Sequence, residues 1–364
     1  MKVLLVVGAR PNYMKVAPLY HSMLKFPSQF DPYIVHTGQH YDANMSDVFF
    51  ANLGLPHPHM FLGVGSGTHA EQTAKAMVAF EKVCVENSPS WVVVVGDVNS
   101  TLAASLVASK LGIRLAHVEA GLRSLDRSMA EEINRIVTDA LSNLLLTPSL
   151  DANENLKREG IEGNRVVFVG NIMIDALEMM RDKIMMSPAL LTFNLKPKEY
   201  FVLTVHRHSN LNNPDFVAGL LRAIIDLAGT VHCVFPVHPH TKKRFQEIGI
   251  WDDLVNIRGA TITEPLGYID FMRLVFDAGF TVTDSGGIQE ETTYMGIPCV
   301  TLRPNTERPI TITHGTNELC TVADLRRKAE IILSGNWKRG TKPPLWDGNT
   351  AARTLEALLA YDGR

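Results

Sequence analysis

The residues best suited to chemistry lie in segment 283–291, which reads Thr-Asp-Ser-Gly-Gly-Ile-Gln-Glu-Glu. It follows an apolar run at residues 274–282, so we expect a buried strand, a tight turn and a helix that begins near Ile288. Backbone N–H groups at a helix N-terminus attract anions, and Gly286 and Gly287 let the backbone approach a ligand closely. The segment therefore predicts a phosphate-binding site.

The surrounding sequence favours a nucleotide ligand over a simple helix cap. Asp284 or Ser285 alone would more often only cap the helix. However, a new strand begins near residues 296–300, and Arg308 follows at its carboxyl end. Glu291, one turn into the helix, is suited to accept hydrogen bonds from ribose hydroxyls.

Four further polar groups stand at or just after the ends of expected strands, namely Asp97, Glu119, the pair Glu131 and Glu132, and His206. Each one alone would more often be a cap or a salt-bridge partner. Around a single cleft, partial burial and mutual repulsion would raise the pKa values of the carboxyl groups and suit them to proton transfer. Cations at the ends of the same elements would stabilise a departing diphosphate, and they are Arg10, Lys15, Arg135, Arg207 and Arg308.

Several other signatures are incomplete. Residues 63–68 place Thr68 where a dinucleotide fingerprint needs its third glycine, and we expect a loop there. The sequence has no Gly-Lys-Ser/Thr phosphate loop, so we expect neither a nicotinamide cofactor nor ATP. The histidine pairs at 206–208 and 238–240 have no carboxylates at ligand spacing, so we expect no metal.

Composition narrows the class of protein. The 364 residues suffice for two domains, and a net charge of -3 gives no basic surplus for nucleic acid. We expect residues 2–8 to form a strand and not a signal peptide, and no apolar stretch reaches membrane-spanning length. The four cysteines are far apart in the sequence, so we expect neither a disulfide framework nor a zinc site. We expect a cytoplasmic location.

Strand and helix patterns alternate along the whole chain, which predicts an α/β protein with doubly wound parallel sheets. The strands expected in the first half are 2–8, 30–37, 91–95, 114–118, 144–147 and 166–169. Those expected in the second half are 200–205, 231–237, 255–258, 280–283 and 296–300. We predict one domain at 1–169, onto which a C-terminal helix at about 350–364 packs back, and a second at 170–349. Ligands of such sheets lie outside the carboxyl ends of the strands, so we expect a cleft between the domains.

The motifs form an ordered set: Gly-Ala-Arg-Pro at 8–11 with Lys15, Thr-Gly-Gln-His at 37–40, Gly-Asp at 96–97, His-Val-Glu-Ala-Gly-Leu-Arg at 117–123, Glu-Glu-Ile-Asn-Arg at 131–135, Thr-Val-His-Arg at 204–207, Pro-Val-His-Pro at 236–239, Asp-Ser-Gly-Gly-Ile-Gln-Glu-Glu at 284–291 and Thr-Glu-Arg-Pro at 306–309. In order and spacing, the chain resembles the non-hydrolysing UDP-N-acetylglucosamine 2-epimerases over nearly its whole length. The resemblance implies a fold similar to the GT-B glycosyltransferases, with two Rossmann-like domains beside a deep cleft.

The resemblance also implies the reaction, which is inversion at C2 of UDP-GlcNAc to give UDP-ManNAc. In this family UDP is eliminated across C1–C2 to leave 2-acetamidoglucal and is then added back, with a proton delivered to the opposite face. No external cofactor is needed, the partner is the UDP-sugar, and the protein is commonly a homodimer.

By resemblance the acid/base set is Asp97, Glu119, Glu131 and His206, and the resemblance does not divide their roles. The UDP-binding set is Arg10, Ser285, Gly286, Gly287, Glu291 and Arg308, with Lys15 and Arg135 near the sugar and diphosphate. Phe271 matches the position that meets the uracil, although a Phe on an amphipathic helix is more often part of the core.

A second, regulatory UDP-GlcNAc site occurs in many family members, and here it would involve Gln39, His40, Asp42, Arg207 and His238. Asp42 stands where the family has a glutamine, and Glu71 where it has an arginine. Because two acids repel a diphosphate, we expect this allosteric step to be absent or to use other contacts. Ala130 also replaces the proline that usually precedes the glutamate pair.

Other functions on the same fold remain open. A glycosyltransferase, a hydrolysing epimerase that releases ManNAc and UDP, or a 2-epimerase of a UDP-2,3-diacetamido-glucuronate would fit similar motifs. The segment Gly-Gln-His-Tyr-Asp at 38–42 with Gly-Ser-Gly at 65–67 resembles the diacetamido-uronate branch. A non-catalytic nucleotide-sugar binder ranks last, because Asp97, Glu119 and Glu131 are all retained.

Overall fold

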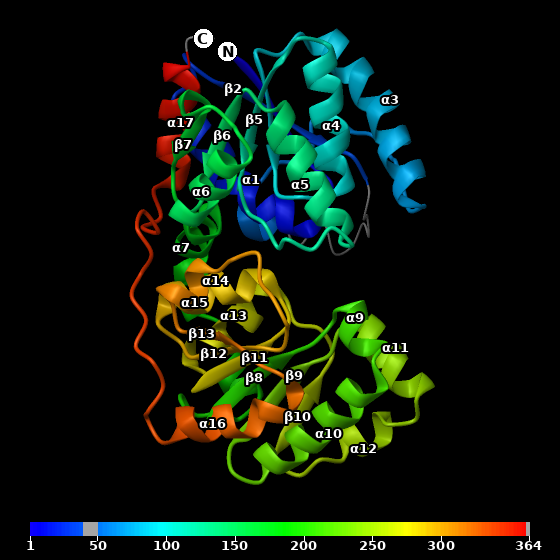
Figure 1. Ribbon diagram of the computed structural model, residues 1–364, viewed down its shortest axis with the longest axis vertical. Coiled ribbons are helices and arrows are strands. Elements are labelled where there is room, and N and C mark those ends of the chain that lie inside the picture. The colour runs from blue at the N-terminus through cyan, green and yellow to red at the C-terminus, as the bar shows by residue number, and fades with distance from the viewer. Residues whose placement is uncertain (39–49, 362–364) are drawn as a thin grey trace. The chain divides into compact units, whose positions relative to one another are not determined.

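The computed structural model describes residues 1–38 and 50–361, apart from the side chain of Arg10. The chain divides into two compact units, each built on its own parallel sheet with flanking helices (Figure 1). Unit 1 comprises Met1–Met179 and Pro344–Arg364, and unit 2 comprises Met180–Pro343. The division falls inside the helix α7 (Ile172–Met185).

The seven strands of unit 1 pair in the order β3-β2-β1-β4-β5-β6-β7, and all of them are parallel. They are β1 (Lys2–Val7), β2 (Asp31–His36), β3 (Met60–Phe61), β4 (Trp91–Val95), β5 (Arg114–Val118), β6 (Leu144–Thr147) and β7 (Val166–Phe168). The adjacent strands β1 and β4 consist almost wholly of buried apolar residues, as expected when both faces of a parallel sheet are covered. The strand order reverses beside β1, so the carboxyl ends of β1 and β4 are where a ligand is expected.

Helices α1 (Arg10–Leu24), α3 (His69–Asn87), α4 (Asn99–Lys110), α5 (Ala130–Leu141), α6 (Leu150–Arg158), α7 (Ile172–Met185) and α17 (Thr350–Ala360) flank this sheet, with a short 3₁₀ turn η1 (Gly163–Arg165). In Figure 1 the C-terminal α17 lies beside α1, and the two helices pack together. Residues 63–67 form a loop, as expected, and Thr68 caps the helix α3 that follows.

The six strands of unit 2 pair in the order β10-β9-β8-β11-β12-β13, again all parallel. They are β8 (Tyr200–Thr204), β9 (His232–Pro236), β10 (Ala260–Thr263), β11 (Phe280–Thr283), β12 (Cys299–Thr301) and β13 (Asn317–Leu319). One apolar core joins the sheet to the helices, and it includes the stacked rings of Phe201 and Phe280. The two sheets with their flanking helices confirm the predicted doubly wound α/β class.

Its helices are α8 (Ala189–Thr192), α9 (His208–Leu211), α10 (Pro214–Ala228), α11 (Pro239–Glu247), α12 (Trp251–Val255), α13 (Tyr268–Asp277), α14 (Gly286–Met295), α15 (Ile310–Thr313) and α16 (Leu325–Leu333), with the 3₁₀ turn η2 (Val322–Asp324). The strand expected at 255–258 was wrong, because Val255 ends α12 and the strand begins at Ala260. Two aspartates in the first turn of α12 favour a helix start. Gly259, at φ 86°, then reverses the chain before β10.

None of the helices in the described part of the chain is long and apolar enough to cross a membrane. All four cysteines are buried and free.

Candidate active site

The turn between β11 and α14 carries the phosphate-binding segment predicted from the sequence. Ser285 occupies the N-cap position of α14, but its side chain makes no capping hydrogen bond. A Cβ on Gly286 would lie 2.7 Å from Nη1 of Arg308, whereas a Cβ on Gly287 would meet nothing within 4 Å. A side chain at position 286 would therefore displace the Arg308 guanidinium from the helix start, and this end of α14 suits an anion.

Arg308 is held beside that helix start by two buried acids. Its Nη1 lies 2.5 Å from Oε1 of Glu307, and its Nε lies 2.9 Å from Oε1 of Glu290. Glu307 also pairs with Arg303 at 2.7 Å and more distantly with Arg207 at 3.8 Å. Burial alone would raise the pKa of Glu307, but Arg308 and Arg303 hold it well below its usual range. Glu307 is thus an ionised centre around which three arginines gather.

A buried glutamine connects the glycine turn to the arginine loop. Nε2 of Gln289 donates to the carbonyl of Ser285 at 3.0 Å, and its Oε1 accepts from the Thr306 hydroxyl at 2.7 Å. That hydroxyl accepts in turn from the backbone N–H of Arg308 at 3.1 Å. The amide therefore fixes the spacing between the helix start and the arginine.

Glu291 lies one turn further into α14 and is buried. The hydroxyl of Tyr268, at the start of α13, donates to its Oε1. Burial raises the pKa of Glu291 to about 8, and the neighbouring Glu290 adds to this effect. A carboxyl group with one oxygen bound to a tyrosine keeps its second oxygen for another polar partner, such as a ribose hydroxyl.

Asp284, at the end of β11, positions the loop that follows β8. Its carboxylate accepts from the backbone N–H groups of His206 and Arg207 at 2.9–3.1 Å, and from the amide of Asn210 at 3.1 Å. Nδ1 of His206 lies 2.9 Å from Oδ1 of the same aspartate, and the His206 side chain is 44% exposed. The histidine is therefore oriented by a buried acid while its ring remains reachable. His238 caps α11, and its ring centroid lies 6.3 Å from that of His206.

In unit 1, Lys15 from α1 forms a buried ion pair with Oε2 of Glu119. Glu119 follows β5 and has a backbone φ of 71°, which is rare for a residue with a side chain. Its second oxygen, Oε1, is buried and has no hydrogen-bond partner among the described residues. Gly96 leaves room for the pair, because a Cβ there would lie 2.8 Å from Nζ of Lys15. The site thus holds an acid in a rare backbone conformation, and one of its oxygens has no partner within residues 1–38 and 50–361.

The second carboxylate of unit 1, Asp97, pairs with Nη1 of Arg135 at 2.5 Å. Arg135 also contacts Glu132 at 2.7 Å, and Glu132 is buried, where it accepts hydrogen bonds from Ser124 and Leu125. Glu131 is instead exposed in the first turn of α5. The fold of unit 1 therefore gathers Asp97, Glu119 and two cations, and pairs each of these two acids with a cation.

The structure brings some of the remaining predicted residues together and leaves others undescribed. Unit 2 gathers His206, Arg207, Ser285, Gly286 and Arg308 at the carboxyl ends of β8, β11 and β12. Phe271 is half-buried on α13. Gln39, His40, Asp42 and the side chain of Arg10 lie outside the described residues.

Several residues that hold these groups in place were not predicted as site residues from the sequence: Gln289, Arg303, Glu307, Asn210 and Tyr268. Gln289 and Glu307 lie inside motifs that the sequence had already singled out. A polar residue in a buried segment between a strand and a helix needs a hydrogen-bond partner, and this could have indicated their positioning role. Arg303, Asn210 and Tyr268 are connected to the site only by the fold, and their spacing in the sequence gives no such signal.

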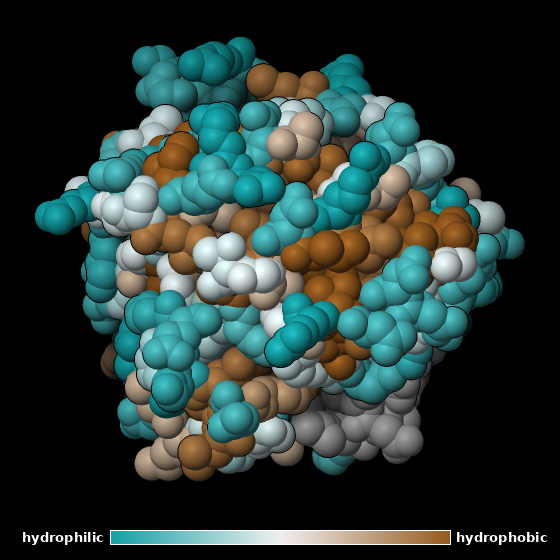
Figure 2. Space-filling model, turned by 90° about the horizontal axis from the view of Figure 1, so that it is seen from below, coloured by the Kyte–Doolittle hydropathy of each residue, from teal (hydrophilic) through white to brown (hydrophobic). Residues whose placement is uncertain are grey.

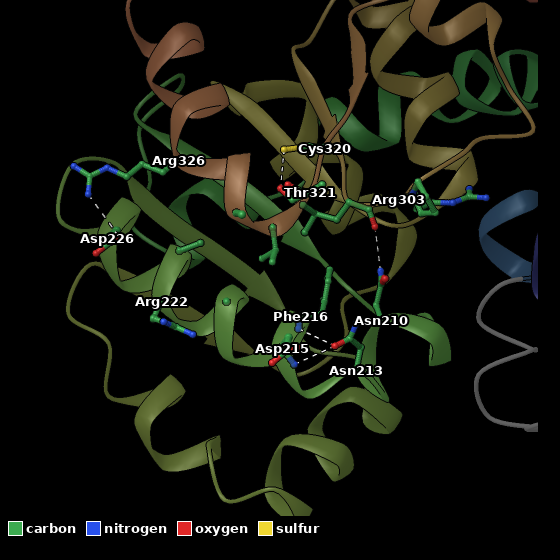
Figure 3. Close-up of a pocket in the computed structure, with 16 residues that line it drawn as sticks. Asn210, Asn213, Asp215, Phe216, Arg222, Asp226, Arg303, Cys320, Thr321 and Arg326 are labelled. Atoms are coloured by element: carbon green, nitrogen blue, oxygen red, sulfur yellow. Dashed lines mark hydrogen bonds and ion pairs between the residues drawn. The ribbon is translucent and has the colours of Figure 1, made fainter.

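One pocket of unit 2, about 680 Å³ in volume, opens between α10 and the η2 segment. Figure 3 shows that several of its polar side chains already have partners: Arg326 faces Asp226 at 3.7 Å, and Asn213 caps α10. The guanidinium of Arg303 turns away from it (Figure 3). None of the predicted site residues that the structure describes lines this pocket, so we do not place the substrate there.

A second hollow of about 830 Å³ is formed by α10, α12 and the turn at Gly259. Figure 2 views the side of unit 2 that carries α10, α12 and α16, where apolar and polar residues are interspersed. Again, none of the predicted site residues within the described ranges lines the hollow. Across residues 1–38 and 50–361, no group of three or more His, Cys, Asp or Glu side chains is arranged to hold a metal ion.

Comparison with known proteins supplies a family. A family model described as UDP-N-acetylglucosamine 2-epimerase matches residues 23–359. The UDP-N-acetylglucosamine 2-epimerase of Methanocaldococcus jannaschii is 42% identical over 367 residues, which cover 98% of this chain and 99% of that protein. The UDP-2,3-diacetamido-2,3-dideoxy-D-glucuronate 2-epimerase of Pseudomonas aeruginosa is 38% identical over 323 residues, 88% of each chain.

The solved structures agree. A crystal structure of the M. jannaschii UDP-GlcNAc 2-epimerase in complex with UDP-GlcNAc and UDP superposes with a TM-score of 0.90 at 42% identity. The superposition covers 99% of this chain and 100% of that chain. The fold is therefore GT-B-like, as the resemblance in sequence implied.

Proposed function

The chain belongs to the UDP-N-acetylglucosamine 2-epimerase family, and we propose that it interconverts UDP-GlcNAc and UDP-ManNAc. The observation that carries this proposal is the match to the M. jannaschii enzyme, at 42% identity over 98% of the chain. The described geometry is compatible with it, because unit 2 offers an anion site and unit 1 offers carboxylates with cationic partners.

In this proposal unit 2 binds the UDP moiety. The start of α14 and the guanidinium of Arg308 hold the diphosphate, and Glu291 accepts hydrogen bonds from the ribose. These groups stabilise the negative charge that develops as UDP departs. Phe271 is assigned to the uracil.

Unit 1 supplies the proton chemistry. The C2–H bond of the sugar is not next to a carbonyl, so direct deprotonation is difficult, and elimination of UDP across C1–C2 gives the neutral 2-acetamidoglucal instead. Re-addition of UDP with a proton delivered to the other face of C2 completes the inversion. We assign the proton transfers to Asp97, Glu119 and Glu131, with His206 as a fourth member of the set. Oε1 of Glu119 is buried and has no hydrogen-bond partner in the part of the chain that the structure describes, which supports a direct role for this residue.

The test is incubation with UDP-GlcNAc in deuterated water, followed by NMR. We expect deuterium at C2, an equilibrium mixture of two UDP-sugars and little free sugar. Glu119→Gln should remove both the exchange and the epimerisation. Accumulation of ManNAc and UDP would show a hydrolysing enzyme instead, and absence of exchange would contradict the proposed substrate.

A second candidate is 2-epimerisation of a UDP-2,3-diacetamido-2,3-dideoxy-glucuronate. The P. aeruginosa relative, at 38% identity over 88% of the chain, supports it. Parallel assays with both UDP-sugars decide between the two, because the true substrate should show the higher kcat/KM.

We also propose a homodimer in the cytoplasm. Four buried, unpaired cysteines fit a reducing compartment. Exposed Val78 and Val85 on α3 and Ile133 on α5 give unit 1 an apolar surface that a second copy would cover. On α3, a two-fold axis at Val78 would pair Lys75 with the Glu81 of the other copy. Val78→Lys should then yield monomers in analytical ultracentrifugation, and an unchanged dimer would exclude this surface.

A further inference from the structure

A histidine with no role in the proposed chemistry lies between the two carboxylate-bearing loops of unit 1. His117, in β5, is fully buried. Its Nδ1 lies 2.6 Å from Oδ1 of Asp139 on α5, and its Nε2 lies 2.8 Å from the backbone carbonyl oxygen of Gly96. Both nitrogens are therefore within hydrogen-bond distance of an oxygen.

The protons of His117 follow from what these oxygens can do. A backbone carbonyl only accepts, so Nε2 must donate to Gly96. Asp139 is also fully buried, and its Oδ2 accepts from the N–H of Gly121 at 3.0 Å and pairs with Arg123 at 2.7 Å. Burial opposes ionisation of Asp139, but two donors at its Oδ2, the Gly121 N–H and the Arg123 guanidinium, favour the carboxylate form, which only accepts hydrogen bonds.

A carboxylate also only accepts, so Nδ1 of His117 must donate as well. His117 is therefore placed to donate from both ring nitrogens and to form a buried ion pair with Asp139.

The same ion pair restrains the backbone on either side of the proposed proton-transfer groups. Gly96, whose carbonyl His117 holds, immediately precedes Asp97. Gly121, whose N–H Asp139 holds, stands two residues after Glu119, the residue with a left-handed backbone. Neither side chain of the pair contacts the carboxylates directly in any described hydrogen bond.

We propose that the His117–Asp139 ion pair is a positioning device that sets the distance and orientation between Asp97 and Glu119. This inference rests on the proposed function, because it assigns these two carboxylates to proton transfer. His117 and Asp139 act through the backbone of Gly96 and Gly121. Because a misplacement of about 1 Å can cost roughly a hundred-fold in rate, loss of either partner should affect turnover far more than nucleotide binding.

The first test concerns protonation alone and needs no substrate. We would label the full chain with [¹⁵N]histidine, record its NMR spectrum at neutral pH, and assign His117 by loss of its signals in His117→Gln. We expect both ring nitrogens of His117 to carry a proton, and in Asp139→Asn only one. A His117 ring with a single protonated nitrogen in the wild-type chain would overturn the ion pair.

The second test separates positioning from simple stability. For His117→Gln and Asp139→Asn we expect kcat to fall about a hundred-fold, while KM for UDP-GlcNAc changes by less than about two-fold. Glu159→Gln is the control. Among the described residues the Glu159 side chain bonds only to Arg123, on the far side of the network, so this variant should leave kcat unchanged. Circular dichroism melting gives the folded fraction of each variant.

The kinetic and NMR experiments test the positioning role and the ion pair separately. Wild-type kcat in both variants, or a fall in kcat no larger than the loss of folded protein, would overturn the positioning role. A wild-type chain that epimerises no UDP-sugar would overturn the proposed function and the positioning role with it, while the NMR result would still decide the ion pair. If His117→Gln does not fold, Asp139→Asn and the wild-type spectrum keep both statements testable.

Discussion

The hydroxyl of Tyr268 donates a hydrogen bond of 2.7 Å to Oε1 of Glu291, which is buried in unit 2. Burial raises the pKa of Glu291 from 4.5 to about 8. Between these two values the native state keeps a proton that the unfolded chain has lost. Because the native state binds more protons in this window, the contribution of Glu291 to stability must decrease as the pH rises from about 4.5 to about 8.

Glu291→Gln should therefore flatten the dependence of stability on pH. We expect the variant to gain a few kcal/mol relative to the wild type between pH 5 and pH 8, on the order of magnitude of a pKa shift of this size. Urea unfolding at the two pH values measures the difference. Glu264→Gln, on an exposed side chain, serves as the control and should show the wild-type slope. Parallel curves for Glu291→Gln and the wild type would contradict a raised pKa.

The buried pair of Lys15 and Glu119 makes a prediction about coupling. Lys15→Met leaves the buried Glu119 carboxylate without its counter-charge, and Glu119→Gln does the same to the Lys15 ammonium. Either variant should lose about 3–5 kcal/mol of unfolding free energy. The double variant leaves no unpaired charge and should be more stable than either single variant. All three should lose epimerase activity. Additive losses in the double variant would show that the two groups are not coupled.

The adjacent acids Glu131 and Glu132 should separate function from stability. Glu132 is buried and accepts three hydrogen bonds from Ser124 and Leu125 besides its pair with Arg135. Glu132→Gln should therefore destabilise the fold by about 2 kcal/mol. Glu131→Gln changes an exposed side chain, so its melting temperature should match the wild type while kcat falls. A Glu131→Gln variant with wild-type kcat would remove this residue from the acid/base set.

Two neighbouring glycines offer a matched pair at the start of α14. Gly286→Ala should destabilise the protein and weaken UDP binding, because its Cβ would lie 2.7 Å from Nη1 of Arg308. Gly287→Ala meets nothing within 4 Å and should add about 0.5–1 kcal/mol of stability through helix propensity. If UDP lies at this helix start, Gly287→Ala should still weaken its binding in calorimetry. Unchanged UDP affinity in both variants would place the nucleotide elsewhere.

The fold was largely predictable because both sheets are parallel and buried on two faces. The strands at 91–95 and 144–147 are almost wholly apolar, and those at 114–118 and 280–283 alternate apolar residues with a few polar ones. The structure places all four at the predicted residues. Helix α3 was not expected, because it follows a glycine-rich loop and its polar and apolar residues are mixed. The prediction of a strand at 255–258 was wrong, because the preceding residues form the helix α12 and Gly259, in a left-handed conformation, delays the start of the strand.

The site was predictable only in part. Motifs near strand ends predict Asp97, Glu119 and Arg308 as site residues, since parallel strands bring their carboxyl ends to one edge. The buried partners that hold them come from other segments. Glu307, for example, pairs with Arg303, and Asp139 reaches His117 across 22 residues of sequence. Which of Glu131 and Glu132 is buried depends on the residue at which α5 begins. The sequence does not mark that residue, because the N-cap position, Met129, has no side chain that can cap the helix.

The last prediction concerns regulation. Glu71, which stands where many family members have an arginine, belongs to the capping box of α3: its carboxylate accepts from the N–H of Thr68 at 2.9 Å, and its own N–H donates to the Thr68 hydroxyl at 3.2 Å. An acid committed to a helix start does not bind a diphosphate, so we expect a hyperbolic dependence of rate on UDP-GlcNAc. UDP-ManNAc should also turn over without added UDP-GlcNAc. Glu71→Ala should lower stability by about 1 kcal/mol and leave the curve hyperbolic. A sigmoidal curve in the wild type would show that a second UDP-GlcNAc site operates through other contacts.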